Sequence, residues 1–502
     1  QHIISNENRK KLNMRLDKLI IGILILHFFN NNFIFCQEII CKSDTNYCYK
    51  KVKFISKNIL LEKKWNSIDL VSTIITPFIV DIDNDCIPEL IIVKNSNEIL
   101  IYNTITFQIK KIIKIPNLAF KASDLTLADI DSDNIPEIFF CALDDFFSMP
   151  LNESGRIMCY NVDGSRRWIS NQKFETNSSN QIGGHLSIAD FDKNGVPELY
   201  IGNKIFNAIT GVKLADGGTN GLGYLGSSDY TSYPGSIAAN LDNDTTDLEL
   251  AAGYSIYKVK LNNLNGIFGN TLVAKNIMVD NEFRDGFTSV GDINNDSTLD
   301  VVVCSPSLNK QAMVYAYSLS NTNVNLIAKI TLQNSFSSAI GFATIGHTEK
   351  SNPISILFNT PINLNSISYD GSLNFKFNWN YPITDTSGYV GVSLFDFNND
   401  GIQELIVRDE TNLSIFDASQ NIPTLLANQA CLSSTSSESL IIGNIDNSHH
   451  AKICVTCGTF PLENPGHLTV FGGPDSFPWP PARSVWNQYA YNPLQINDDL
   501  TV

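Results

Sequence analysis

The residues of this chain with the clearest chemical potential form an acidic run between Asp396 and Leu405. Oxygen-bearing side chains stand at its first, third and fifth positions, Gly401 stands at the sixth, and Glu404 stands at the ninth. Side chains on alternating residues converge on one point when the chain curls around it, and glycine permits the turn that closes the curl. Carboxylates this close repel each other unless a hard cation bridges them, and Ca²⁺ suits a flexible all-oxygen cage better than Mg²⁺. The spacing therefore predicts a calcium loop.

The segments that flank this loop predict strands rather than helices. Residues 391–395 and 405–407 are short β-prone runs without a helical period. An EF-hand would need a glutamate at the twelfth position, between two helices. The sequence therefore indicates a calcium loop within a β-hairpin.

The loop recurs along the chain. Five copies keep the ligand register, whereas a sixth has Leu248 at its ninth position, so its closing ligand must come from Asp247 or Glu249. Two more copies keep the flanking strands and lose the ligands. The predicted ligands are Asp81, Asp83, Asp85, Glu89, Asp129, Asp131, Asp133, Glu137, Asp190, Asp192, Asn194, Glu198, Asn240, Asp242, Asp244, Asp292, Asn294, Asp296, Asp300, Asp396, Asn398, Asp400 and Glu404. We therefore expect about five Ca²⁺ sites and a sixth, partial one.

The eight copies imply a repeat fold. Their first positions are 81, 129, 190, 240, 292, 346, 396 and 444, which lie 48 to 61 residues apart. Each unit has an alternating strand, the loop, a strongly apolar strand, a third strand ending in an aromatic residue, and a polar outer strand. This order predicts an all-β, eight-bladed β-propeller of four-stranded blades, with seven blades as the alternative. A strand near Lys51–Ile55 could close the last blade as a clasp.

Composition and charge restrict the partners. The chain has 502 residues, 43% of them hydrophobic, which is enough to bury a large core. Its formal net charge of -16 is concentrated in the repeated loops. This distribution argues against nucleic acid as a partner and favours bound cations.

The N-terminal part of the sequence predicts export. A basic start after Met14 is followed by the apolar run Leu19–Phe29, which is typical of a signal peptide. The run is shorter than the about 20 residues needed to span a bilayer, and no later transmembrane stretch follows. A lipidated Cys36 is the alternative to cleavage before Gln37. We therefore expect a secreted or outer cell-surface protein.

The expected domain organisation follows from these boundaries. We expect upstream non-native sequence (1–13), a signal peptide (14–36), lead-in strands (37–76), the propeller (77–474) and a junction to a missing C-terminal region (475–502).

The cysteines suggest disulfides, because an exported chain meets an oxidising environment. Cys141 and Cys159 are expected in adjacent strands of one blade and could pair. Cys457 closes a Cys-Val-Thr-Cys motif that resembles a redox or zinc motif. A structural strand cysteine, or a bridge from this motif to Cys431, is the preferred interpretation.

Two insertions depart from the repeat, at residues 142–155 and 214–235, and the second is rich in glycine and tyrosine. Long loops that closure does not require often carry binding on a propeller. Tyr224, Tyr230 and Tyr233 are therefore candidate ligand-binding residues that could stack on sugars or pack on a partner. A simple connection is the alternative interpretation.

The unit Phe287–Val303, with its acidic loop between two strands, resembles the FG-GAP (VCBS) repeat family. These calcium-loop propellers occur in integrin α-subunit heads and in bacterial surface proteins. Phe471-Gly-Gly-Pro474 is similar to the motif that names the family, with its alanine missing. The resemblance covers residues 77–474 and implies the fold and calcium binding. Residues 475–502 resemble the junction that follows such propellers in bacterial surface proteins exported by type IX secretion.

Two functions follow from these features. The first is an adhesion or binding module for an extracellular protein or glycan ligand. A spacer within a longer adhesin would have the same sequence features. The alternative is a polysaccharide lyase or hydrolase, since some similar calcium propellers are such enzymes. Catalysis needs a convergent acid, base or nucleophile outside the calcium loops, and the sequence suggests no catalytic residues of this kind. The binding module is therefore the preferred hypothesis.

Overall fold

The computed structural model describes residues 59–502, apart from residues 95–96, 116–124, 143–152, 154, 175–184, 224–234, 243, 278–282, 307–310, 321–322, 333–338, 350–353, 421, 434, 436–438, 447, 460–463 and 490. The chain divides into two compact units, residues 1–40 and 41–502, and every described residue belongs to the second. The predicted signal peptide, the expected clasp at Lys51–Ile55 and the tyrosines Tyr224, Tyr230 and Tyr233 lie outside the described residues.

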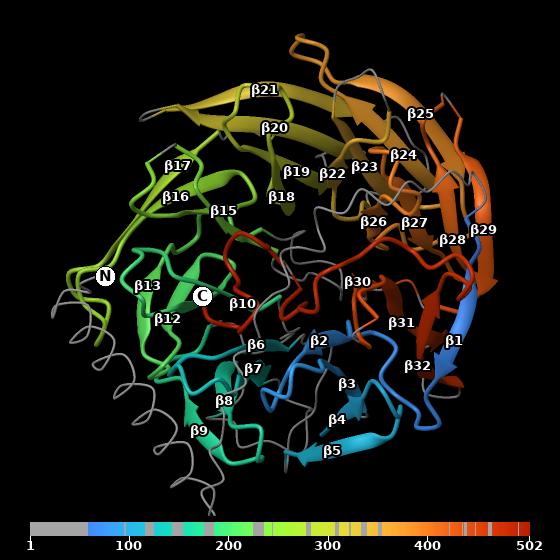
Figure 1. The fold of residues 1–502 in the computed structure, drawn as a ribbon. Helices are drawn as coiled ribbons and strands as arrows, with labels where there is room; N and C mark the ends of the chain where they lie inside the picture. Colours follow the sequence, from blue (N-terminus) through green and yellow to red (C-terminus); the bar gives the residue numbers. More distant parts are fainter. Residues whose placement is uncertain are drawn as a thin grey trace, which may run out of the picture. The chain divides into compact units, whose positions relative to one another are not determined.

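The second unit consists of eight antiparallel sheets of four strands, arranged as blades around a common centre (Figure 1). Each blade is given from its innermost to its outermost strand. The first four blades are β2 (Phe78–Val80), β3 (Glu89–Lys94), β4 (Glu98–Asn103) and β5 (Ile109–Lys114); β6 (Thr126–Ala128), β7 (Glu137–Ala142), β8 (Arg156–Tyr160) and β9 (Arg166–Ile169); β10 (Ser187–Ala189), β11 (Glu198–Ile201), β12 (Lys204–Asn207) and β13 (Lys213–Asp216); and β14 (Ile237–Ala239), β15 (Glu249–Ala252), β16 (Ser255–Lys260) and β17 (Thr271–Asn276). The fifth to eighth blades are β18 (Phe287–Gly291), β19 (Asp300–Pro306), β20 (Ala312–Ser320) and β21 (Asn323–Thr331); β22 (Thr344–Gly346), β23 (Ser355–Thr360), β24 (Asn363–Ser368) and β25 (Lys376–Pro382); β26 (Val392–Phe395), β27 (Glu404–Arg408), β28 (Asn412–Asp417) and β29 (Thr424–Ala430); and β30 (Ile441–Gly443), β31 (Lys452–Thr459), β32 (Asn464–Gly472) and β1 (Glu62–Asn66). The predicted eight-bladed propeller is confirmed, and the seven-bladed alternative is wrong.

Burial explains the gradient of hydrophobicity across each blade. Strands β3 and β4 are buried almost throughout, whereas the outermost strand β5 alternates between half-buried and exposed residues. Second and third strands lie between two neighbouring blades, so both of their faces are covered and their sequences are apolar. The outermost strand has a free edge, and its lysines keep that edge solvated.

Apolar side chains from successive blades pack into shared clusters. One cluster, for example, contains Tyr200 and Leu214 of the third blade together with Leu250 and Tyr257 of the fourth. Each blade therefore buries its faces against its two neighbours and depends on them for stability.

The eighth blade is closed by a strand from the other end of the chain. β1 pairs with β32 through the register Glu62↔Gly472 to Asn66↔Thr469, while β30, β31 and β32 come from the C-terminal part of the sequence. The expectation of a clasp is thus met by Glu62–Asn66, downstream of the expected Lys51–Ile55.

The segment after Pro474 packs on the propeller. Trp486 exchanges backbone hydrogen bonds with Ile79 on β2, and the Asn487 side chain donates to the Leu127 carbonyl on β6 at 2.8 Å. Figure 1 shows this segment, in red, across the middle of the ring. Val485 belongs to the same buried cluster as the first blades, so part of the expected junction contributes to the core.

The strand order places the acidic loops at one face. Each blade has four antiparallel strands and is left at the edge where it was entered, so every loop between first and second strands lies at the same edge. We call this edge the acidic face. At the opposite face, second strands end and third strands begin, and the chain leaves one blade and enters the next.

The structure corrects the boundaries of both insertions. Ala142 is the last residue of β7, and Leu214 is a buried residue within β13, so the departures from the repeat begin after Ala142 and after Asp216. The sequence interpretation was wrong because apolar strand residues and an insertion rich in glycine run together without a break.

One of the suggested disulfides is confirmed and the other is wrong. Cys431 and Cys457 form a bond that spans 26 residues. Cys141 and Cys159 are buried and are not bonded to each other. They lie on adjacent strands, but Cys159 is opposite Phe139 and Cys141 is opposite Ile157. This diagonal placement exceeds the usual span of a disulfide.

In the described part of the chain, no helix has the length and apolar character needed to cross a membrane.

Candidate metal sites

The first residue of each intact acidic loop organises the backbone around it. Asp396 Oδ1 accepts a hydrogen bond from the Asp400 amide at 3.1 Å, and Asp396 Oδ2 accepts one from the Gly401 amide at 2.8 Å. The same pair of bonds forms at Asp81, Asp129, Asp190 and Asp292. The chain therefore curls around this carboxylate in all five loops, as the spacing predicted.

The sixth position needs a left-handed backbone whatever its residue type. Gly195 and Gly401 have φ of 82° and 87°, and Cys86, Asn134 and Ser297 have φ of 65° to 70°. Non-glycine residues rarely adopt this conformation without local support. Here the hydrogen bond from the sixth amide to the first carboxylate holds it in place.

The ninth-position carboxylate is the first residue of the second strand and is buried. Glu198 and Asp300 are fully buried, and each accepts a hydrogen bond from the amide of the second loop residue at 3.1 Å. Burial makes the charged form of a carboxylate unfavourable unless a positive charge lies nearby. It raises the pKa of Glu198 to about 9 and that of Asp300 to about 7.

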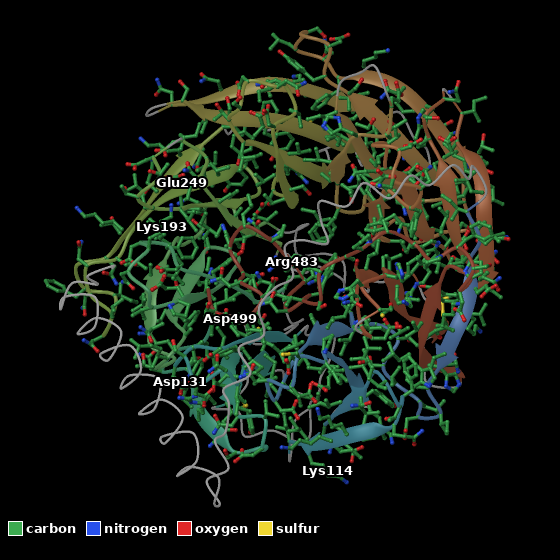
Figure 2. All side chains as sticks on the ribbon, viewed as in Figure 1. Lys114, Asp131, Lys193, Glu249, Arg483 and Asp499 are labelled. Atoms are coloured by element: carbon green, nitrogen blue, oxygen red, sulfur yellow. A yellow bond between two sulfur atoms is a disulfide. The ribbon has the colours of Figure 1, made fainter. Side chains whose placement is uncertain are left out.

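Four of the loops bring three acidic side chains together, with ligand oxygens within 4.8 Å of one another. The sets are Asp81, Asp83 and Asp85; Asp129, Asp131 and Glu137; Asp190, Asp192 and Glu198; and Asp242, Asp247 and Glu249. The loops at 292–300 and 396–404 have asparagine at the third position and so contribute amide oxygens beside their carboxylates. Asp131 and Glu249 are labelled in Figure 2, in the second and fourth blades.

The fourth loop is complete in a different register. Asp247 and Glu249 both join Asp242, as the sequence allowed, and Glu249 Oε2 accepts a hydrogen bond from the Leu241 amide at 2.9 Å. Asp244 is outside this set, and its Oδ1 accepts from the Thr246 amide and hydroxyl. One additional residue before the second strand shifts the closing carboxylate by one position.

Some buried carboxylate oxygens in these loops have no hydrogen-bond donor. Among the described residues, these include Glu198 Oε1 and Asp192 Oδ1 in the third loop, Asp247 Oδ1 in the fourth and Asp300 Oδ1 in the fifth. A buried acceptor without a partner costs about 1–3 kcal/mol. A hard cation coordinated by these oxygens would remove that cost, so the donor set fits Ca²⁺ or a similar ion.

In the first, second and fourth loops, a basic side chain lies among the acids. Lys110 Nζ lies 2.7 Å from Glu89 Oε1 and 2.7 Å from Asp83 Oδ2. The Arg167 guanidinium lies 2.7 Å from Asp131 and also contacts Glu137. Lys258 contacts Asp242 and lies 3.1 Å from Glu249. The sequence interpretation missed these residues, although Lys110 and Arg167 occupy corresponding places in the outermost strands.

The buried glutamate of the third loop predicts a pH dependence. The pKa of Glu198 is raised by burial from 4.5 to about 9, so the folded, ion-free protein binds a proton that the unfolded chain releases. Its contribution to stability is therefore lost as the pH rises through this window. We expect the ion-free free energy of unfolding to fall by about 3 kcal/mol between pH 5 and pH 7.5 from this group.

Urea unfolding in EDTA at several pH values measures this effect. The Glu198→Gln variant is the matched control, and its pH dependence should be shallower by that amount. An ion-free wild type whose stability rises over the same window would contradict the prediction.

No protein-family model matches the chain, and no curated protein sequence matches it. Among solved structures, the biofilm matrix protein Bap1 from V. cholerae is similar, with a TM-score of 0.61 at 14% sequence identity. The match covers 89% of this chain and 96% of that chain. At this identity, the likeness shows the fold alone.

Two further solved structures match less well. The exotype rhamnogalacturonan lyase YesX has a TM-score of 0.49 at 13% identity, over 82% of this chain and 75% of that chain. Quinohemoprotein alcohol dehydrogenase from Comamonas testosteroni has a TM-score of 0.48 at 11% identity, over 82% and 76%.

Proposed function

We propose that this chain is a secreted or outer cell-surface propeller, stabilised by calcium, that binds an extracellular protein or glycan. The acidic loops carry the calcium part of the proposal. Their buried carboxylates converge, and the described residues provide no hydrogen-bond donor for Glu198 Oε1 and Asp300 Oδ1. Ca²⁺ accepts six to eight oxygen ligands in flexible geometry, which suits loops that mix carboxylate, amide and backbone oxygens.

The site of recognition is proposed at the face opposite the acidic face. β13 ends and β14 begins at that face, and the sequence between them contains the three tyrosines. Its base is held firmly, because the amides of Leu222 and Gly223 donate to the Asp285 carboxylate at 2.6 and 2.9 Å. The Gly235 amide donates to the Gly223 carbonyl at 2.8 Å, so the insertion begins and ends at neighbouring points. A loop with such a fixed base suits binding.

Export is part of the proposal for two reasons. The N-terminal sequence has the pattern of a signal peptide. The Cys431–Cys457 disulfide fits an oxidising compartment outside the cytosol. A biofilm matrix protein with a similar fold is compatible with this setting, but at 14% identity it supports the fold only.

The test is binding of the labelled, calcium-loaded protein to arrays of glycans and extracellular proteins. We expect a specific ligand, and we expect Tyr224→Ala, Tyr230→Ala and Tyr233→Ala together to weaken its binding about tenfold or more, because aromatic contacts contribute about 0.5–1.5 kcal/mol each. The free energy of unfolding should change by no more than about 0.5 kcal/mol, because the proposal gives these tyrosines no part in the core.

Phe268→Ala is the matched control. Phe268 is 92% exposed and lies between the third and fourth strands of the fourth blade, at the acidic face. This variant should bind like the wild type. Full binding by the triple-tyrosine variant would place recognition elsewhere, and shortened oligosaccharide products on the array would favour the enzymatic alternative.

A further inference from the structure

The outermost strands of five blades with an acidic loop contain a β-bulge at one fixed register. In the first blade, Ile101 is opposite Lys111 and Tyr102 is opposite Ile109, so Lys110 is the additional residue. In every bulged blade with a full acidic loop, this irregularity lies opposite the same part of the third strand, near the closing carboxylate. The bulged residues of the first, second, third, fifth and seventh blades are Lys110, Arg167, Leu214, Ile327 and Leu426.

The type of the bulged residue decides what faces the acids. In the first two blades, the bulged Lys110 and Arg167 form ion pairs with the ninth-position carboxylates Glu89 and Glu137. Lys110 Nζ also lies 3.4 Å from Asp85, so one ammonium group contacts three acids of its loop. Bulges re-aim a side chain, and here they aim a cation into the loop.

The fourth blade reaches the same result by another route. Its outermost strand pairs with β16 without a bulge, and Lys258 on β16 lies directly opposite Glu249. Lys258 forms ion pairs with Glu249 and Asp242. A basic side chain therefore lies within this loop as well, although Asp247 Oδ1 is buried there without a hydrogen-bond partner among the described residues.

The third, fifth and seventh blades have apolar residues at the bulge. Within the described part of the chain, the ion pairs include none to the ligand residues of the loops at 190–198, 292–300 and 396–404. Glu198 Oε1 and Asp300 Oδ1 are buried there, and no described residue donates a hydrogen bond to either oxygen. In the seventh loop, Glu404 Oε1 accepts a hydrogen bond from the Asn398 amide group at 2.6 Å.

We infer that the six acidic loops form two classes, which the bulged or facing residue determines. The loops of the third, fifth and seventh blades bind a divalent cation, whereas Lys110, Arg167 and Lys258 neutralise the other three from within the protein. This inference rests on the proposed calcium binding. Two like charges about 4 Å apart repel by several kcal/mol near a protein surface, so a Ca²⁺ ion and the resident ammonium or guanidinium group cannot share one cage.

The experiment counts Ca²⁺ bound per chain by equilibrium dialysis at about 1 mM free Ca²⁺, the upper end of the affinity range of extracellular modules. We expect about three ions in the wild type, about four in Lys110→Met, and about two in Leu426→Lys, because each exchange removes or adds one competing cation. Glu198→Gln should lose one ion, whereas Glu89→Gln should keep the wild-type count.

Lys114→Met is the matched control. Lys114 is on the same strand as Lys110, is largely exposed, and pairs with Glu98 rather than with the loop (Figure 2 labels it). This variant should keep the wild-type count. Lys110→Met replaces a charged side chain by an apolar one of similar length, so this variant should fold. It therefore tests the inference even if Leu426→Lys does not fold.

The outcomes separate this inference from the proposal beneath it. About six ions in the wild type, with no change in Lys110→Met, would overturn the two classes and leave calcium binding intact. A count of three that no bulge variant alters would overturn the role of the bulge. No bound ion in any variant would overturn both.

Discussion

Chelation of calcium is expected to lower the melting temperature of the folded chain by on the order of 10 °C. An ion that binds only the folded state adds RT ln(1 + [L]/Kd), which is about 2.7 kcal/mol for each site at 100 times its Kd. Three such sites would contribute about 8 kcal/mol, and a domain of this size shifts by one to a few degrees per kcal/mol. The reason is local, because in the ion-free loops buried oxygens of Glu198 and Asp300 have no hydrogen-bond partner in the described part of the chain.

Thermal unfolding in EDTA, followed by addition of excess Ca²⁺, measures this shift. Mg²⁺ at equal concentration should restore much less, because it requires near-ideal octahedral geometry and dehydrates reluctantly. The combined variant Glu198→Gln, Asp300→Asn and Glu404→Gln is the control, and its melting temperature should respond little to calcium. A wild-type melting temperature that EDTA leaves unchanged would contradict this prediction.

Loss of the clasp strand should have an effect of similar size. β1 is the outermost strand of the eighth blade, and its Trp65 ring stacks on Phe107 of the first blade with centroids 4.8 Å apart. The clasp therefore contacts both sides of the junction where the ring closes. Deleting residues 59–66 exposes the edge of β32, and an exposed long edge is a site for pairing between chains. We expect aggregation and loss of cooperative unfolding.

Two measurements make this prediction specific. Size-exclusion chromatography should show oligomers of the deleted protein, and a synthetic peptide of residues 59–74 added during refolding should return it to a monomer, because the peptide can restore the missing strand. Ile68→Ser is the control, since Ile68 is 91% exposed just beyond the strand. A deleted protein that melts as cooperatively as the wild type would show that closure does not depend on β1.

The sequence predicted the repeat and its hairpin loops because both depend on residues close together in the chain. The amides of Asp400 and Gly401 both donate to the Asp396 carboxylate, and the three residues lie within six positions of the chain. The spacing of the side chains alone therefore predicts the curl. The count of blades followed from counting these loops. The ninth-position carboxylates were predicted for the same reason, since each begins the strand that follows its loop.

Contacts between residues distant in sequence were decided only by the tertiary structure. The clasp pairs Glu62 with Gly472, and many nearby stretches have enough β-propensity to serve as that strand, so the sequence could not choose among them. Lys110 contacts Glu89 because a bulge in β5 adds one residue between Ile109 and Lys111. No feature of the sequence of that strand predicts the bulge. The sequence alone thus determined the positions of the acidic loops. The packing of the outer strands decided which of these loops contain a basic side chain.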